Sequence, residues 1–175
     1  LRAYVVICGV MILIVAWSLR DPGISAEGFR TAVFQVVSLL TTTGFATADY
    51  ELWPQLGIFL LLILLVIGGM AGSTAGGIKT IRIIIGWRAV KRSVALAPHR
   101  HAIRKVRFSG EPVREATVSG VLVFFVMYFS LALLSAALLA GAGYDLATSV
   151  SAALTTIGNV GPGLGQVGPT DHFAH

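Results

Sequence analysis

Long stretches without a charged side chain constrain this chain more than any other feature of its sequence. Residues 52–78 contain no Asp, Glu, Lys or Arg, and neither do residues 116–140. A helix needs about 20 apolar residues to cross a hydrocarbon core of about 30 Å. Hydrophobic residues make up 55% of the chain and charged residues only 12%. The sequence therefore predicts an integral membrane protein.

A third uncharged stretch, residues 3–19, is slightly short for a membrane span and is closed by Arg20, Asp21 and Pro22. Because the chain opens inside this apolar run, we expect the helix to have begun further upstream. A secretory signal peptide is the alternative, since Arg2 precedes the apolar run. It is the weaker interpretation, because no small-residue cleavage pattern follows before Arg20.

Basic residues gather between the second and third uncharged stretches, which predicts that the loop 79–114 is cytoplasmic. They are Lys79, Arg82, Arg88, Lys91, Arg92, Arg100, Arg104, Lys105, Arg107 and Arg114. Their place beside membrane spans, without interleaved aromatic residues, favours contact with anionic lipid over nucleic-acid binding, despite the net charge of +5. His99, His101 and the basic cluster to Arg107 form either solvated surface or a contact with a cytoplasmic regulatory protein.

A short motif occurs twice in similar surroundings. Residues 31–40 and 146–154 are moderately apolar but too short to cross a bilayer, and each follows a longer apolar stretch. Each leads into one copy of the motif, which reads Leu40-Thr41-Thr42-Thr43-Gly44-Phe45 in the first copy and Leu154-Thr155-Thr156-Ile157-Gly158-Asn159 in the second. The recurrence predicts two structural repeats, each with a helix that enters the membrane and stops partway.

Backbone beyond the end of such a helix is tolerated at membrane depth only where protein buries it or water and ions lie beside it. The sequence therefore predicts that both loops line an ion pathway. Carbonyl groups would bind a dehydrated cation, Gly44 and Gly158 would allow the necessary backbone angles, and Thr42 and Thr156 would add hydroxyl oxygens. The alternative is an ordinary helix end closed by glycine.

Glycines interrupt the second stretch between Gly68 and Gly77. Each weakens a helix by roughly 1 kcal/mol relative to alanine, so we expect the helix to break within the membrane. The predicted intramembrane gate consists of Gly68, Gly69, Gly72, Ser73, Thr74, Gly76, Gly77 and Lys79. Close helix packing through Gly-x-x-x-Gly is one alternative. A phosphate-binding loop is a weaker one, because Ile78 separates Gly77 from Lys79.

These motifs resemble the Trk/Ktr/HKT superfamily of potassium transport proteins, in particular its bacterial Trk H type of membrane subunit. The segments that resemble the third and fourth filters of that family are Thr42-Thr43-Gly44-Phe45 and Thr156-Ile157-Gly158-Asn159-Val160-Gly161-Pro162-Gly163. The resemblance implies potassium sites at Thr42, Thr43, Gly44, Phe45, Thr156, Ile157, Gly158 and Asn159, with K⁺ as the transported ion and no bound cofactor. Residues 68–82 resemble the family's glycine-rich interruption, which implies gating.

The resemblance implies an all-α integral membrane fold of tandem repeats, each built as membrane helix, pore helix, filter loop and membrane helix. We expect a third-type repeat at 1–92, a basic loop at 93–114 and a fourth-type repeat at 115–175 that lacks its last helix. The family carries four repeats around one pore, so we expect this portion not to conduct by itself.

Potassium uptake across the bacterial inner membrane is the predicted function, and the filter mouths are expected on the external side. The resemblance also implies a homodimer of membrane subunits and a cytoplasmic nucleotide-binding regulatory partner. No grouping of residues indicates an enzyme. A non-conducting assembly subunit, whose glycines pack helices, is the alternative function.

Overall fold

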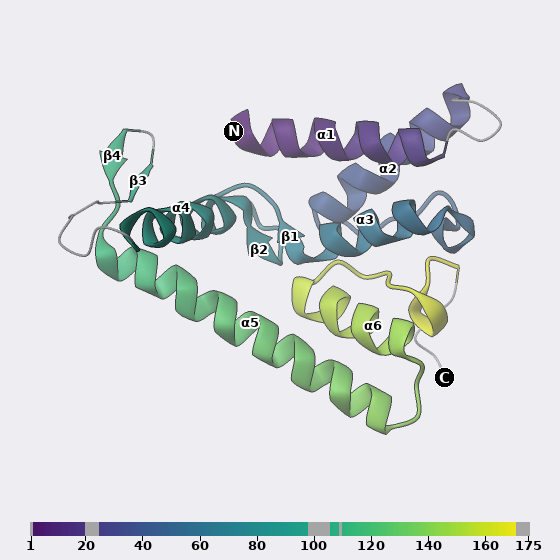
Figure 1. Cartoon of the computed structure of the whole chain (residues 1–175). Helices are drawn as coiled ribbons and strands as arrows, with labels where there is room; N and C mark the ends of the chain where they lie inside the picture. Colours follow the sequence, from purple (N-terminus) through teal and green to yellow (C-terminus); the bar gives the residue numbers. More distant parts are fainter. Residues whose placement is uncertain (1, 20–24, 98–105, 109, 171–175) are drawn as a thin grey trace. The chain divides into compact units, whose positions relative to one another are not determined.

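The computed structural model describes residues 2–19, 25–97, 106–108 and 110–170, and most of them are helical (Figure 1). The chain forms two compact units. The first combines residues 1–80 with residues 132–175, and the second comprises residues 81–131. The expected ends at Arg20, Asp21 and Pro22, and the basic residues Arg100, Arg104 and Lys105, lie outside the described residues.

Three helices build the core of the first unit. They are α1 (Arg2–Ser18), α2 (Ala26–Leu40) and α3 (Gln55–Val66), and α2 and α3 are joined through the short 3-10 helix η1 (Tyr50–Leu52). Most of their buried side chains are apolar, apart from Gln35 and Ser38 of α2. The apolar side chains with almost no exposed surface include Val15, Val36, Leu39, Leu40, Leu61 and Leu64. The core therefore holds α2 against both α1 and α3, which fixes the position of the predicted loop at its C-terminal end.

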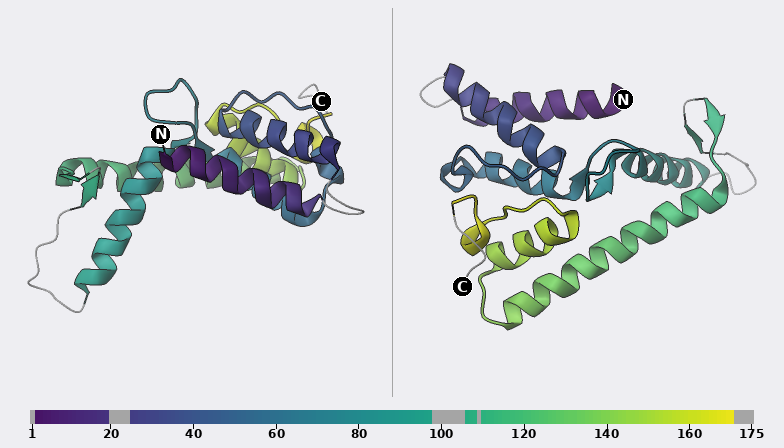
Figure 2. Two further views of the ribbon diagram at one scale, coloured as in Figure 1. Left: turned by 90° about the horizontal axis from the view of Figure 1, so that it is seen from above. Right: turned by 180° about the vertical axis from the view of Figure 1, so that it is seen from behind.

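A fourth helix, α6 (Leu146–Gly158), lies alongside α3 and is followed by the 3-10 helix η2 (Gly165–Val167) (Figures 1 and 2). Asp145 caps it: the side chain accepts hydrogen bonds from the Thr148 hydroxyl and from the Thr148 N–H at 3.1 Å. These bonds, the hydroxyl bond first, hold the pKa of Asp145 below its ordinary value. The carboxylate thus marks the start of the second short helix.

Among the described residues, one helix is long and apolar enough by length and composition to cross a membrane, namely α5 (Glu115–Gly141). The expected span at 52–78 is not a single helix, because α3 ends at Val66 after about 18 Å at 1.5 Å per residue. The predicted break at the glycines is present, and helix α4 (Thr80–Leu96) begins only beyond them.

The expected all-α fold needs a small correction. Strands β1 (Ile67–Gly68) and β2 (Ile78–Lys79) pair in parallel on either side of the glycine-rich segment. Strands β3 (Arg107–Phe108) and β4 (Glu111–Pro112) form an antiparallel pair. Each strand has two residues, so the fold remains mostly helical. The first pair forms because backbone groups that leave a helix must still find hydrogen-bond partners.

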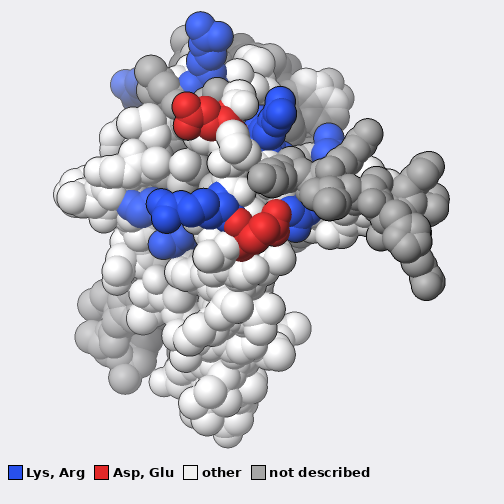
Figure 3. Space-filling model, turned by 90° about the vertical axis from the view of Figure 1, so that its left-hand side faces the viewer, with Lys and Arg blue, Asp and Glu red and all other residues white. Residues whose placement is uncertain are grey.

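The second unit joins α4 to the first part of α5 around a small apolar core of Ile85, Ala89, Val106, Val118 and Val121. Its basic side chains are largely engaged within the unit. The Arg88 guanidinium donates to the Arg107 carbonyl, Arg92 pairs with Glu115, and Arg82 lies 4.0 Å from the centre of the Phe124 ring. Figure 3 shows basic and acidic side chains side by side on the face that it draws.

Candidate functional site

The first of the two predicted pore loops, residues 41–45 and here called the first pore loop, begins where α2 ends at Leu40. Thr42 has a left-handed backbone with φ +56°, and Gly44 follows with φ +78°. The N–H groups of Thr43 and Gly44 both donate to the Ser38 carbonyl, at 2.9 and 3.4 Å. The Ser38 hydroxyl in turn donates to the Phe45 carbonyl at 2.6 Å. The loop is therefore folded back on the end of its own helix, in the manner of a helix C-cap.

The second pore loop repeats this geometry after α6. Asn159 is left-handed with φ +50°, and Gly161 has φ +119°. The Val160 N–H donates to the Thr155 carbonyl at 3.0 Å, and the Gly161 N–H donates to the Thr155 hydroxyl at 2.9 Å. The two loops thus share a left-handed residue, a backbone bond to the same helix position and a glycine with positive φ.

This geometry shifts the predicted register of the second loop by three residues. The backbone of Asn159-Val160-Gly161 matches that of Thr42-Thr43-Gly44. The repeated sequence motif had instead aligned Thr156 with Thr42 and Gly158 with Gly44. Thr156, Ile157 and Gly158 belong to α6, so the expectation of non-helical backbone there is wrong. The helix runs on through Gly158 and is closed by Asn159, which takes the left-handed cap conformation that asparagine tolerates better than most residues.

The two pore loops touch at their glycines. A Cβ atom placed on Gly44 would lie 1.9 Å from the Val160 carbonyl oxygen, and one placed on Gly161 would lie 3.9 Å from the Gly44 Cα. No side chain fits at Gly44, so its backbone lies directly against that of the second loop. Phe45 is 71% exposed and points away from the core.

The glycine-rich segment forms a closed loop over residues 69–77. The β1–β2 pair joins its two ends, and the Thr80 hydroxyl and N–H donate to the carbonyls of Gly68 and Gly69, both at 3.1 Å. A Cβ on Gly68 would lie 2.1 Å from the Gly76 carbonyl oxygen. The ends of the loop can approach this closely because they carry no side chains.

The side chain of Lys79 stabilises the same loop by hydrogen bonds to its backbone. Its ammonium donates to the carbonyls of Ser73 and, at 2.8 Å, of Ala75. A Lys head bound to its own loop is not arranged as a phosphate ligand, which argues against the phosphate-binding alternative. Gly68, Gly72 and Gly76 lie outside the α-helices, so the alternative of Gly-x-x-x-Gly helix packing does not apply to them.

The glycine-rich loop contacts the first pore loop and the end of α6 at Gly76. The Gly76 N–H donates to the Thr42 hydroxyl at 3.0 Å, and a Cβ on Gly76 would lie 1.9 Å from the Gly158 carbonyl oxygen. By contrast, Gly72, Ser73 and Thr74 are exposed at the other side of the loop. Of the predicted gate residues, Gly76 therefore meets the end of α6 and the first pore loop.

Two residues outside the predicted site, Tyr50 and Glu51, connect the segments that follow the two loops. The hydroxyl of Tyr50 donates to the Gly163 carbonyl at 2.8 Å, and the Glu51 carboxylate accepts from the Gly165 N–H. Burial, followed by the neighbouring carboxylates of Glu51 and Asp49, raises the pKa of Tyr50, so its hydroxyl stays protonated and able to donate. No local pattern marks these residues, because their partners lie more than a hundred positions away.

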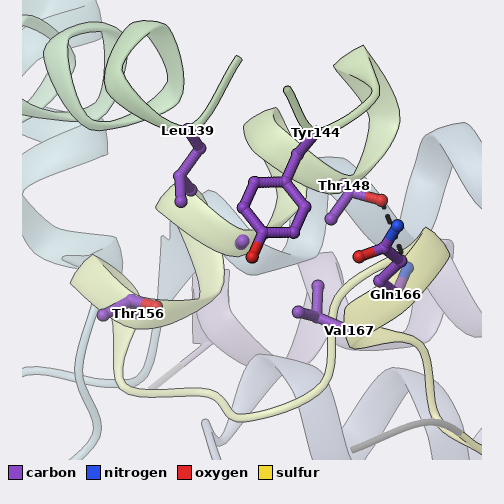
Figure 4. Close-up of a pocket in the computed structure, with 7 residues that line it drawn as sticks. Leu139, Tyr144, Thr148, Thr156, Gln166 and Val167 are labelled. Carbon is purple, nitrogen blue, oxygen red and sulfur yellow. Dashed lines mark hydrogen bonds between the residues drawn. The ribbon is translucent and has the colours of Figure 1, made fainter. Parts of the chain in front are cut away.

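A cavity of about 210 Å³ lies beside the second pore loop (Figure 4). It is lined by Leu139, Tyr144, Thr148, Ala152, Thr156, Gln166 and Val167. The Gln166 N–H donates to the Thr148 hydroxyl at 3.2 Å across its rim. Thr156, predicted as an ion ligand, faces this largely apolar cavity from α6. The described residues hold no group of three His, Cys, Asp or Glu side chains placed to bind a metal ion.

Comparison with known proteins gives consistent matches. Residues 22–174 match the family TrkH, described as cation transport protein. The Trk system potassium uptake proteins TrkH and TrkI of Halomonas elongata are 38% and 30% identical over 80% and 94% of the chain. The crystal structure of the potassium transporter TrkH from Vibrio parahaemolyticus superposes with a TM-score of 0.86 and 34% identity over 95% of the chain. The chain spans 29% and 34% of the two Halomonas relatives and 36% of the Vibrio chain.

Proposed function

The chain belongs to the TrkH family of cation transport proteins, and from this premise we propose that it supplies two of the loops that select potassium in an uptake pathway across the bacterial inner membrane. The observation that carries the proposal is the contact between two pore loops of the same backbone geometry, Gly44 against Val160. Discrimination of K⁺ from Na⁺ is part of the proposal and follows from the family alone.

The physical support is the type of backbone involved. Both pore loops are non-helical segments within a chain of strongly apolar helices, and such segments persist in a membrane where water or ions satisfy them. Residues 42–45 and 159–162 offer the oxygens of this filter. Thr156 and Ile157, predicted from the repeated letters, are helical residues behind it.

The glycine-rich loop is the proposed gate. It is fastened by Lys79 and meets the filter segments through Gly76. In the closed state it blocks the pathway below the filter, and movement of residues 69–77 away from Thr42 and Gly158 opens it. Residues 70–74 of this loop are exposed, and an exposed segment with few buried apolar contacts has a low free energy of opening.

The remaining parts of the proposal concern topology and partners. The loop 79–114 is cytoplasmic and the filter mouths are external. The complete protein is a homodimer in lipid, regulated by a cytoplasmic nucleotide-binding subunit. The repeat bounds of 1–92 and 115–175, with the loop 93–114 between them, belong to the same proposal.

A flux measurement tests the function directly. The protein is expressed from the complete reading frame that contains this chain and reconstituted into liposomes. We expect inward K⁺ flux down an imposed gradient, with Na⁺ carried more slowly. Correctly inserted protein that carries neither ion would favour the assembly subunit, whose role is packing alone.

A matched pair of threonine variants tests the structural register. Thr42→Val removes the acceptor of the Gly76 N–H and costs about 1–3 kcal/mol, so we expect the gate to loosen and K⁺ flux without stimulation to rise. Thr156→Val removes the same hydroxyl from a helical residue, so flux should stay near the wild-type value. Flux is measured at a potassium concentration above the KM. Any weaker potassium binding, caused by losing the Thr42 hydroxyl as an ion ligand, then does not hide the expected rise in flux. The reverse order of sensitivity would restore the register read from the repeated letters.

A further inference from the structure

The outer ends of the two pore loops are joined by side chains that neither loop supplies. Tyr50 follows the first loop and is only 2% exposed. Its hydroxyl donates to the Gly163 carbonyl at 2.8 Å, just beyond the second loop. A buried hydrogen bond of this kind restrains the distance between two backbone segments, because losing it leaves a carbonyl unpaired.

Glu51 adds a second restraint at the same place. Its carboxylate accepts from the Gly165 N–H, and a Cβ on Gly168 would lie 3.1 Å from the Glu51 carboxyl carbon. Gly165 and Gly168, both in the segment 163–168, thus lie against this side chain. A charged acceptor makes the stronger kind of hydrogen bond.

The same segment is also held by a hydrogen bond to α6 and by a second bond within itself. The Leu164 N–H donates to the Ser151 hydroxyl at 2.8 Å, and the Gly163 N–H donates to the Val167 carbonyl at 2.6 Å. On the inner side, Thr155 of α6 holds Val160 and Gly161. Residues 159–162 therefore lie between two fixed ends, of which the outer one depends on Tyr50 and Glu51.

We propose that Tyr50 and Glu51 are positioning residues that set the cation selectivity of the filter. Together they form a clamp that holds the exit of the second loop against the exit of the first. The clamp fixes the spacing between the carbonyl oxygens of the two loops, and a filter that discriminates by that spacing loses discrimination when the clamp is released. The inference rests on the proposed potassium pathway.

Tyr50→Phe is the sharpest test, because it removes one hydroxyl and leaves the ring in place. The complete protein in liposomes is assayed for K⁺ and Na⁺ flux per inserted molecule. We expect the K⁺/Na⁺ flux ratio to fall, with an upper bound of about tenfold if the full free energy of one buried hydrogen bond is lost from the K⁺-selective spacing. The matched control is Tyr128→Phe in α5, since the Tyr128 hydroxyl is buried without a hydrogen-bond partner in the described part of the chain.

A Glu51 pair separates positioning from simple attraction of cations by a carboxylate. Glu51→Gln keeps an acceptor oxygen for the Gly165 N–H and should retain the ratio, whereas Glu51→Ala should lower it as Tyr50→Phe does. A Tyr50→Phe protein with an unchanged ratio would overturn the clamp, even if its insertion and total flux fall together. Wild-type protein without K⁺ flux would instead refute the proposed function itself.

Discussion

Replacing Gly44 with valine should abolish potassium uptake while the protein still inserts into the membrane. Gly44 has φ +78°, where a β-branched residue is strained by about 1–3 kcal/mol. The new side chain would also begin 1.9 Å from the Val160 carbonyl oxygen. Because that neighbour is backbone, it cannot turn aside as a flexible side chain does. The two pore loops must then separate, and the oxygens of the proposed filter separate with them.

Uptake by cells that lack their own potassium systems measures this effect, with membrane content determined in parallel. Gly9→Val is the matched control, since Gly9 is helical and a Cβ there meets nothing within 4 Å. Cells that carry the Gly9→Val protein should take up potassium and grow as cells with the wild-type protein do. Normal uptake by Gly44→Val would mean that the contact between the loops plays no part in transport.

Replacing Gly76 with alanine should produce a pathway that conducts without stimulation. The added Cβ would lie 1.9 Å from the Gly158 carbonyl oxygen and 2.8 Å from its carbon, so the glycine-rich loop has to move away from the end of α6. That movement also strains the bond between the Gly76 N–H and Thr42. A loop displaced in this way no longer closes the proposed pathway, and basal K⁺ flux in liposomes should rise several-fold.

Gly72→Ala provides the control within the same loop. Gly72 has φ +85°, so alanine strains the backbone, but nothing lies within 4 Å of the new Cβ. This variant perturbs the loop without pushing it from α6 and should leave basal flux low. If Gly76→Ala instead abolishes flux in correctly inserted protein, the loop supports the filter and does not gate it.

Much of the local structure could be predicted from the sequence. The break in the second apolar stretch follows from glycines that cost helix stability, and α3 does end at Val66. The family was also predicted correctly, because its glycine-rich and filter motifs are long and specific. The two strand pairs were missed, since two-residue strands leave no pattern in a sequence.

The register of the second loop was the main error, and its cause is physical. Identical letters, Thr-Thr-x-Gly, do not end a helix at the same point, because the end depends on which residue adopts the left-handed cap. In the first copy Thr42 takes that conformation, whereas in the second the helix runs on to Asn159. The strain at a β-branched Thr42 is offset by its contact with Gly76, which comes from a distant segment.

The amino-acid sequence alone determined that this chain is apolar, that its second apolar stretch breaks at the glycines and that it carries two similar loops, because charge, glycine content and repetition are local properties. The tertiary structure alone decided which backbone atoms meet: Gly44 with Val160, Gly76 with Thr42 and Tyr50 with Gly163. These contacts join residues far apart in the chain, and they depend on the packing of α2, α3 and α6, which no single segment encodes.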